Sequence, residues 1–304
     1  MHHQNQRSSQ SISRQHSWSI AYFLAGLMLL TCLLVITLGS QRPSANPAAA
    51  AMLPTGTPGP FVTPDSDTLA EHARLLYQAE RPLAAFNAAQ TVITRLEPEE
   101  DTPLNTFETA TLFRAYFLRG QIYFDREEYA AALADFGRAI ELQPEIAEAY
   151  AARADVLRAQ DNLEDALLDY TRAIEYDNSE PAYYVARGRA YIQLCTYRLA
   201  IIDFNDALAF NDTYADAYYY RGIANTAIED YEAAIEDFAM ALDLTPDNAR
   251  IYRERGFTYL AADDPESART DLLIYLERAP DAPDRAEVEA ALAKIDAEAG
   301  ADSE

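Results

Sequence analysis

Residues that could carry out catalysis are scarce in residues 65–304. His72 is the only histidine in that stretch, which excludes a histidine zinc cluster and a histidine-based nucleophilic triad there. The sequence has no phosphate-binding glycine loop and no G-x-S-x-G nucleophile motif. The acidic run at 97–101 could supply paired carboxylates, but such a run is typical of a solvated surface. The sequence therefore predicts no enzyme activity, no catalytic residue, no metal site, no cofactor and no small-molecule substrate.

Two charged columns recur with a period of 34 residues, and the aspartate follows the arginine by 16 positions in every copy. A ligand site would not normally repeat identically in each copy, so we interpret the columns as a structural ladder of ion pairs within or between adjacent units. An exposed pair contributes only about 0.2 to 1 kcal/mol, whereas linked and partly buried pairs could set the repeat geometry. The arginines are Arg119, Arg153, Arg187, Arg221 and Arg255, and the aspartates are Asp135, Asp169, Asp203, Asp237 and Asp271.

The same period organises residues 113–282 as a whole. Five copies follow one another without a gap, at 113–146, 147–180, 181–214, 215–248 and 249–282. Each copy has a tyrosine, then a small residue, then an invariant alanine and finally a large apolar residue. The tyrosines are Tyr116, Tyr150, Tyr184, Tyr218 and Tyr252, and the small residues are Gly120, Ala154, Gly188, Gly222 and Gly256. The alanines are Ala132, Ala166, Ala200, Ala234 and Ala268, and the large residues are Phe136, Tyr170, Phe204, Phe238 and Leu272.

The apolar spacing within each copy indicates two amphipathic helices and a turn. Ala132, Phe136, Ala139 and Ile140 lie at i, i+4, i+7 and i+8, which places them on one helix face. The small residue of the first helix, helix A, lies where the second helix, helix B, must approach closely, and the aromatic of helix B fills the remaining gap. We expect Gly222→Leu to block this contact. A single hairpin cannot bury its apolar face, so neighbouring copies must stack.

The order aromatic, Gly, Tyr, Ala, Phe, Ala, Pro at this period resembles the tetratricopeptide repeat, and the stretches 120–144 and 222–246 match it almost column for column. The sequence departs from the family pattern at Leu157 and Asn225, where tyrosine is usual, and in the fifth copy. The resemblance implies an all-α fold, namely a right-handed α-solenoid of helix-turn-helix repeats. It also implies that the helices A line a concave groove that binds a protein or peptide.

The resemblance assigns the second, fifth, sixth, ninth and twelfth residue of each copy to this groove. Some family members clamp a carboxylate-terminated peptide with Lys and Asn, but here those columns hold Phe, Ala, Val and Tyr, which disfavours that use. An apolar and aromatic patch in the last two copies, next to two arginines, could bind an extended or helical peptide, or its side chains could pack against one another or the C-terminal helix. The patch comprises Tyr219, Tyr220, Ile223, Phe257 and Leu260 with Arg250 and Arg253. The other candidate groove residues are Arg114, Phe117, Gln121, Phe124, Arg158, Arg189 and Ile192.

The N-terminal 64 residues differ in composition. Residues 1–17 form a polar tail, and residues 18–40 are apolar and uncharged, which predicts a transmembrane signal-anchor helix because about 20 residues cross a bilayer core of roughly 30 Å. A cleaved signal peptide is the alternative, but its apolar region would be shorter and its cleavage site closer. Arg7 and Arg14 precede the helix and Arg42 follows it. The positive-inside rule then predicts a single-pass protein with a cytoplasmic N-terminus and an extracytoplasmic repeat domain.

The remaining segments flank the five copies. Residues 41–64 contain six prolines, which predicts a flexible linker. Residues 65–112 are interpreted as a degenerate N-terminal repeat and an acidic insertion, followed by a helix that begins near residue 105 or 106. Residues 283–304 are expected to form a capping helix and an acidic tail. Cys195 is expected to be a small packed thiol.

The net charge of the chain limits the class of molecule that it can bind. All 49 acidic residues but only 21 of the 24 basic ones lie in residues 65–304, which gives that part a net charge of -28. Such a surface repels nucleic acid and favours basic or neutral partners, and it also provides solubility. We therefore predict a membrane-anchored scaffold that binds a protein or peptide and no nucleic acid. The alternatives are an assembly or chaperone-type factor that holds client polypeptides transiently, and a non-catalytic subunit of a membrane complex.

Overall fold

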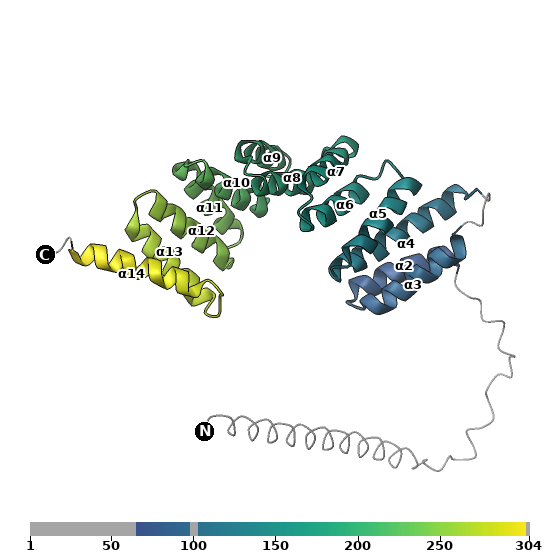
Figure 1. Cartoon of the computed structure of the whole chain (residues 1–304), viewed down its shortest axis with the longest axis horizontal. Helices are drawn as coiled ribbons and strands as arrows, with labels where there is room; N and C mark the ends of the chain where they lie inside the picture. Colours follow the sequence, from purple (N-terminus) through teal and green to yellow (C-terminus); the bar gives the residue numbers. More distant parts are fainter. Residues whose placement is uncertain (1–64, 98–102, 302–304) are drawn as a thin grey trace, which may run out of the picture. The chain divides into compact units, whose positions relative to one another are not determined.

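The computed structural model describes residues 65–97 and 103–301, in which every regular element is an α-helix. In these ranges no helix is both long and apolar enough to cross a bilayer. The predicted transmembrane helix at 18–40 and the linker at 41–64 lie outside the described residues. The helices follow one another along the chain as drawn in Figure 1. They are α2 (Ser66–Gln78), α3 (Pro82–Leu96), α4 (Thr106–Asp125), α5 (Tyr129–Leu142), α6 (Ala147–Ala159), α7 (Leu163–Tyr176), α8 (Pro181–Gln193), α9 (Tyr197–Phe210), α10 (Ala215–Ala227), α11 (Tyr231–Leu244), α12 (Ala249–Ala261), α13 (Pro265–Arg278) and α14 (Arg285–Ala301).

Successive helices pair into hairpins, and the hairpins stack as a solenoid. The even-numbered helices from α4 to α12 are the helices A of the five copies, and each packs against the helix B that follows it. Four of them begin at the residue where the sequence starts its copy, namely Ala147, Pro181, Ala215 and Ala249. Neighbouring helices A also contact one another, whereas no two helices B do so among the described residues. The helices A therefore form a continuous layer, whose exposed side we call the helix-A face.

Helix α4 begins where its side chains cap it. The Asn105 side chain accepts a hydrogen bond from the Glu108 backbone N–H at 2.9 Å, and the Glu108 carboxylate accepts one from the Asn105 N–H at 3.0 Å. This reciprocal capping box satisfies two backbone donors that a helix start would otherwise leave unpaired. The structure therefore starts the helix at the position that the sequence indicates.

The contact between the two helices of a hairpin depends on the small-residue column. A Cβ atom built on Gly188 would lie 2.6 Å from Cε1 of Phe204, and one built on Gly222 would lie 2.8 Å from Cε1 of Phe238. Real Cβ atoms do not approach a ring this closely, so these glycines allow helix B to reach van der Waals contact with helix A. By contrast, Gly137, in α5 but outside this column, would meet nothing within 4 Å.

Every hairpin turn contains one residue in the left-handed backbone region, two positions after the last residue of its first helix. These residues have φ between 55° and 66°, and none of them is glycine. Such a conformation costs a side-chain-bearing residue of order 1 kcal/mol or more, yet each hairpin adopts it. The residues are Glu80, Glu127, Asp161, Cys195, Glu229 and Asp263. The α2–α3 hairpin shares this turn with the five copies.

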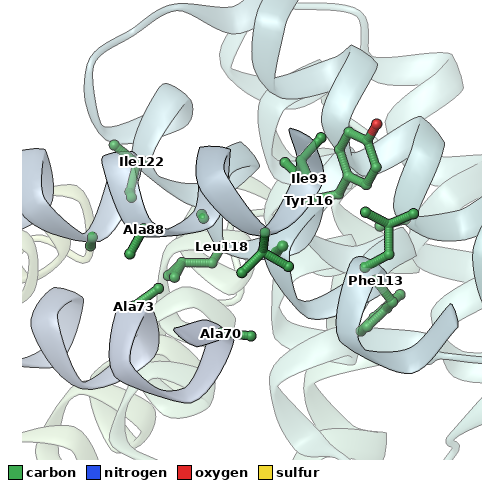
Figure 2. Packing of buried hydrophobic residues seen from close by; sticks show 14 of the residues in the cluster. Ala70, Ala73, Ala88, Ile93, Phe113, Tyr116, Leu118 and Ile122 are labelled. Carbon is green, nitrogen blue, oxygen red and sulfur yellow. The ribbon is translucent and has the colours of Figure 1, made fainter. Parts of the chain in front are cut away.

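The α2–α3 hairpin stacks on α4 through a common apolar cluster. Figure 2 shows Ala73 of α2 and Ala88 of α3 close to Leu118 and Ile122 of α4. These four side chains are buried. Residues 66–96 thus occupy the place of one more repeat ahead of the five, and the acidic insertion lies partly outside the described residues.

Helix α14 covers the last hairpin. Val288, Leu292 and Ile295 are buried in one cluster with Leu272 and Tyr275 of α13. The three buried residues of α14 lie at i, i+4 and i+7, so they form one apolar stripe. The C-terminal helix therefore shields the apolar surface that the fifth copy would otherwise expose.

Candidate peptide-binding face

The two charged columns meet inside each hairpin. Every arginine of the column donates hydrogen bonds to both carboxylate oxygens of the aspartate 16 residues later, at distances between 2.5 and 3.0 Å. The aspartates are buried, and the arginine side chains keep 13 to 30% of their surface exposed. The pairs therefore join helix A to helix B of the same copy, and each carboxylate is held in a two-point contact.

Three of the arginines also reach the preceding unit. Nη1 of Arg187 donates to Thr171 of α7 at 3.2 Å, and Nη1 of Arg221 donates to Asn205 of α9 at 2.6 Å. Arg119 makes the equivalent contact with Gln90 of α3 at 2.5 Å. The other two copies have Gly137 and Ala239 at this place in the preceding helix B, and neither side chain can accept a hydrogen bond. The sequence columns did not indicate this link between units.

Burial and pairing act in opposite directions on these groups. Burial raises the pKa of Asp203, and the donated hydrogen bonds of Arg187 oppose that shift. Hydrogen bonding to Asp203 in turn raises the pKa of Arg187. A buried ion pair of this kind recovers little more than the cost of removing two charges from water. Its role is then to fix the crossing of the two helices, and losing one partner would leave the other charge buried and uncompensated.

The helix-A face contains a first pocket at its N-terminal end, with a volume of about 360 Å³. Phe113 and Phe117 stack in its floor with ring centroids 5.8 Å apart. The candidate residues Arg114 and Gln121 also line it, and Arg114 forms an ion pair with Asp67 of α2. Further lining comes from Ala70, Glu71, Arg74, Tyr77 and Gln78 of α2, from Leu118, and from Glu148 of α6. The candidate Phe124 lies elsewhere, packed against Tyr129 of the helix B that follows.

A second pocket, of about 210 Å³, lies where α6, α8 and α10 meet. It brings together the candidates Arg158, Arg189, Ile192, Tyr220 and Ile223, with Gln193 as an additional member. The Arg189 guanidinium lies 4.9 Å from the centroid of the Tyr220 ring. No carboxylate in the described part of the chain forms an ion pair with Arg189. This pocket, which we call the arginine pocket, therefore combines apolar walls with a cation that has no protein counter-ion.

These repeats match known family models. Models described as tetratricopeptide repeat match residues 113–146, 147–180, 185–249 and 221–293, which together cover more than half of the chain. The chain belongs to the tetratricopeptide repeat family. No curated protein matches it.

Solved structures share the fold at low sequence identity. The Cut9–Hcn1 hetero-tetramer of the APC/C has a TM-score of 0.62 at 16% identity, covering 76% of this chain and 43% of that one. A tetratricopeptide repeat protein from Parabacteroides merdae has a TM-score of 0.58 at 19% identity, covering 70% and 79%. MamA from residue 41 onward, from Desulfovibrio magneticus RS-1, has a TM-score of 0.52 at 22% identity, covering 57% and 98%. These similarities describe the fold of the tetratricopeptide repeats here.

The predicted aromatic patch of the fourth and fifth repeats does not form one continuous open surface. Arg253 pairs with Asp284 at 2.5 Å and with Glu287 at 3.2 Å, which ties it to the start of α14. Phe257 and Leu260 pack against the same apolar cluster as the buried side of α14. The alternative in which these side chains pack against the C-terminal helix is therefore the one observed for the fifth repeat. Arg250 stays exposed.

Tyr219 is also part of the tetratricopeptide repeat core. Its side chain is only 8% exposed and lies against the rings of Tyr220, at 5.0 Å between centroids, and Phe238, at 6.2 Å. Burial raises the pKa of Tyr219 to about 12. Truncating this residue would damage the packing of the fourth repeat, so Tyr220, which is half-buried in the arginine pocket, is the tyrosine that tests binding.

Sequence reasoning missed two features near these pockets. The α2 side chains of the first pocket lie before the recognised repeats, and only their helical periodicity pointed to them. In the second repeat, the Tyr170 hydroxyl donates to Asp155 at 2.7 Å and accepts from Arg158 Nε at 3.2 Å. The sequence signal for this network was Tyr170 itself, a tyrosine in a column that otherwise holds Phe or Leu. The packed thiol expected at Cys195 is wrong, because this residue is exposed in the hairpin turn.

Proposed function

We propose that this chain is a scaffold that binds a segment of a partner protein along its helix-A face. The arginine pocket carries the proposal, because it offers apolar walls and a guanidinium without a counter-ion on a continuous layer of helices. Arginine next to tyrosine is a composition that binding hot spots favour. The tetratricopeptide fold leaves this face exposed along the stacked repeats, where an extended or helical segment fits.

Site-specific photo-crosslinking tests the binding face. A photoreactive amino acid at Ile192, which lines the arginine pocket, should give covalent adducts with a partner in intact cells. The matched control is Met240 on α11, which is 42% exposed but lies on a helix B. Adducts at Ile192 and none at Met240 support the proposal, whereas equal labelling at both positions contradicts it. A ladder of many different adducts at Ile192 would favour the alternative of a chaperone-type factor that holds client polypeptides transiently.

We further propose that residues 18–40 anchor the scaffold in a membrane and that residues 41–64 separate it from the bilayer. The uncharged apolar run and the six prolines that follow it support this arrangement. The two arginines before the run support a cytoplasmic N-terminus and extracytoplasmic repeats.

Cysteine labelling tests the orientation. Cys195 is exposed, and the other cysteine, Cys32, lies inside the proposed anchor. A membrane-impermeant maleimide added to intact cells should modify the chain, and Cys195→Ser should abolish the modification. Labelling that requires prior lysis of the cells would place the repeats on the cytoplasmic side and overturn the orientation.

A second candidate function is that of a non-catalytic subunit in a stable membrane complex. Leu168 and Ile202 occupy the same repeat position on α7 and α9, and they are 66% and 54% exposed. Exposed aliphatic side chains on the helices B would suit a permanent neighbour. Co-purification in a fixed stoichiometry that Leu168→Ser abolishes, while substitutions at Ile192 leave it unchanged, would favour this function over binding on the helix-A face.

A further inference from the structure

We propose that the arginine pocket binds one acidic side chain of the partner segment together with a neighbouring aliphatic side chain. The inference rests on the proposed function and narrows it to a class of ligand. Two guanidinium groups, from Arg158 and Arg189, line a single pocket whose other walls are Ile192, Gln193, Tyr220 and Ile223. Two like charges in one small pocket repel each other, and a carboxylate placed between them would be attracted by both.

Arg189 is arranged to receive that carboxylate. Its guanidinium lies over the Tyr220 ring, with 4.9 Å between the central carbon and the ring centroid. A contact of this kind is electrostatic attraction to the ring and does not occupy the N–H donors of the guanidinium with a hydrogen-bond acceptor. Among the described residues, none accepts a hydrogen bond from the Arg189 side chain or forms an ion pair with it. A planar group with free donors in a fixed fork matches the two oxygens of a carboxylate.

Arg158 is held by a small polar network. Its Nε donates to the Tyr170 hydroxyl at 3.2 Å, and its Nη2 lies 3.4 Å from Asp155. The contact with Asp155 is long, and Tyr170 takes part of the capacity of that carboxylate through its own hydrogen bond of 2.7 Å. Asp155 therefore compensates the charge of Arg158 only in part. Of the five residues in this column, Tyr170 alone has a hydroxyl, so the network is specific to the second repeat.

The contrast with other arginines on the helix-A face supports a ligand here. Arg114 pairs with Asp67, and Arg253 pairs with Glu254, Asp284 and Glu287. Each of these cations has a protein counter-ion, whereas Arg189 has none in the described part. Arg250 forms no ion pair with the described residues either, but it is exposed at the start of α12, so Arg189 differs in being half-buried beside Arg158. A chain with a net charge of -28 in residues 65–304 has many acidic residues that could have supplied one. The missing anion is therefore expected to come from the partner.

The volume of the arginine pocket and the charge of the surrounding surface limit which ligand can bind there. A volume of about 210 Å³ is smaller than the roughly 300 Å³ at which small-molecule sites begin, so the pocket suits one or two side chains of a longer segment. At physiological salt, charges beyond about 8 Å are largely screened, so the two arginines dominate at contact. A strongly acidic segment would still be repelled by the rest of the surface. We therefore infer one acidic residue in an otherwise neutral or basic sequence.

A displayed library of random twelve-residue peptides, selected against the full chain in a mild non-ionic detergent, tests the inference. The expected result is a set of binders that share one Asp or Glu next to Leu, Ile or Val and carry no net negative charge elsewhere. Replacing that acid by its amide in a synthetic binder should weaken affinity by about 10- to 100-fold, as expected for loss of a charge-assisted two-point contact.

Variants of the chain locate the contact. Arg189→Gln and Arg158→Gln should each weaken binding of the acidic peptide about tenfold or more, with little effect on its amide counterpart. Arg189→Lys keeps the charge but loses the planar fork, so it should lie between the wild type and Arg189→Gln. The control is Arg198→Gln, because Arg198 is exposed near the start of α9, away from the pocket. Thermal unfolding of each variant shows whether it is folded.

Two further outcomes separate this inference from the proposed function. If the selected peptides have no common acid, or if Arg189→Gln binds the acidic peptide as tightly as the wild type, the inference is wrong while binding on the helix-A face stands. If no peptide from the library binds the full chain, both fail.

Discussion

Arg187 and Arg189 lie two residues apart on α8, and the structure uses them in opposite ways. Arg187 points into the hairpin, holds Asp203 at 2.7 and 2.9 Å and recurs in every repeat. Arg189 points to the helix-A face, lies over the Tyr220 ring and has a different residue in its column in each of the other repeats. The region between the helices is thus repeated, and the exposed face varies. A repeat array keeps its stacking geometry constant and changes the residues at the surface, where binding is decided.

The comparison of Arg187 with Arg189 predicts that substitution of the repeated arginine, Arg187, has the largest effect on stability. Arg187→Met should lower the free energy of unfolding by about 3 kcal/mol, because Asp203 would remain buried without a partner. Arg189→Met, on the same helix, should cost only about 0.5 kcal/mol, the value of its contact with the Tyr220 ring. Denaturant unfolding of both variants measures the difference, and adding Asp203→Leu to Arg187→Met should recover much of the loss. Equal small losses for the two single variants would show that the ladder does not hold the hairpin.

The close contact between helices A and B predicts the next effect. Gly222→Leu should destabilise the chain by about 2 kcal/mol, since even a Cβ atom there would lie 2.8 Å from the Phe238 ring. Gly137→Leu is the matched control, because a Cβ at Gly137 meets nothing within 4 Å and leucine favours helix more than glycine does. Unfolding midpoints in urea compare the two variants. A larger loss for Gly137→Leu would contradict the assignment of the small column to the hairpin contact.

The pH dependence of stability tests whether Tyr219 is buried in the core or accessible on the helix-A face. Burial raises its pKa to about 12, against about 10 in an unfolded chain. The folded state then keeps the phenol proton that the unfolded state loses, so the stabilisation is complete below pH 10 and is lost as pH rises toward 12. At pH 11 the loss from this group is about 1 kcal/mol.

The check is urea unfolding of the wild type and of Tyr219→Phe from pH 9 to pH 12. The variant should lose less stability over this range, because it has no phenol to titrate. Other buried tyrosines shift in the same direction, so part of the decline remains in both proteins. Identical slopes would mean that Tyr219 is accessible to water, as a groove residue would be.

The smallest expected effect concerns the left-handed residue of the hairpin turn, where substitution should increase stability instead of lowering it. Cys195→Gly should stabilise the chain by about 0.5 kcal/mol, because relief of the left-handed conformation at φ 55° exceeds the extra backbone entropy that glycine loses. Cys195→Ala keeps a Cβ atom and should bring no gain. Thermal unfolding under reducing conditions compares the three proteins, and a loss of stability in Cys195→Gly would refute the interpretation of this turn.

The sequence by itself determined the features that recur. Period, helix pairing and the close approach of Gly222 to Phe238 follow from apolar spacing and side-chain size, which act locally or between adjacent helices. The pairing of Arg187 with Asp203 followed from two columns with one constant offset. These features could be predicted because the same physical requirement selects the same residue types in all five copies of the sequence.

Only the tertiary structure decided which single-copy residues are available to a partner. Phe257 and Leu260 stand in groove columns, yet they pack against the same cluster as α14, and Tyr219 packs into the core through its contacts with Tyr220 and Phe238. Ile192 and Arg189 remain open in a pocket built from three separate helices. Burial depends on how neighbouring helices turn toward each other, and no periodicity within one repeat encodes the neighbour that will cover a given side chain.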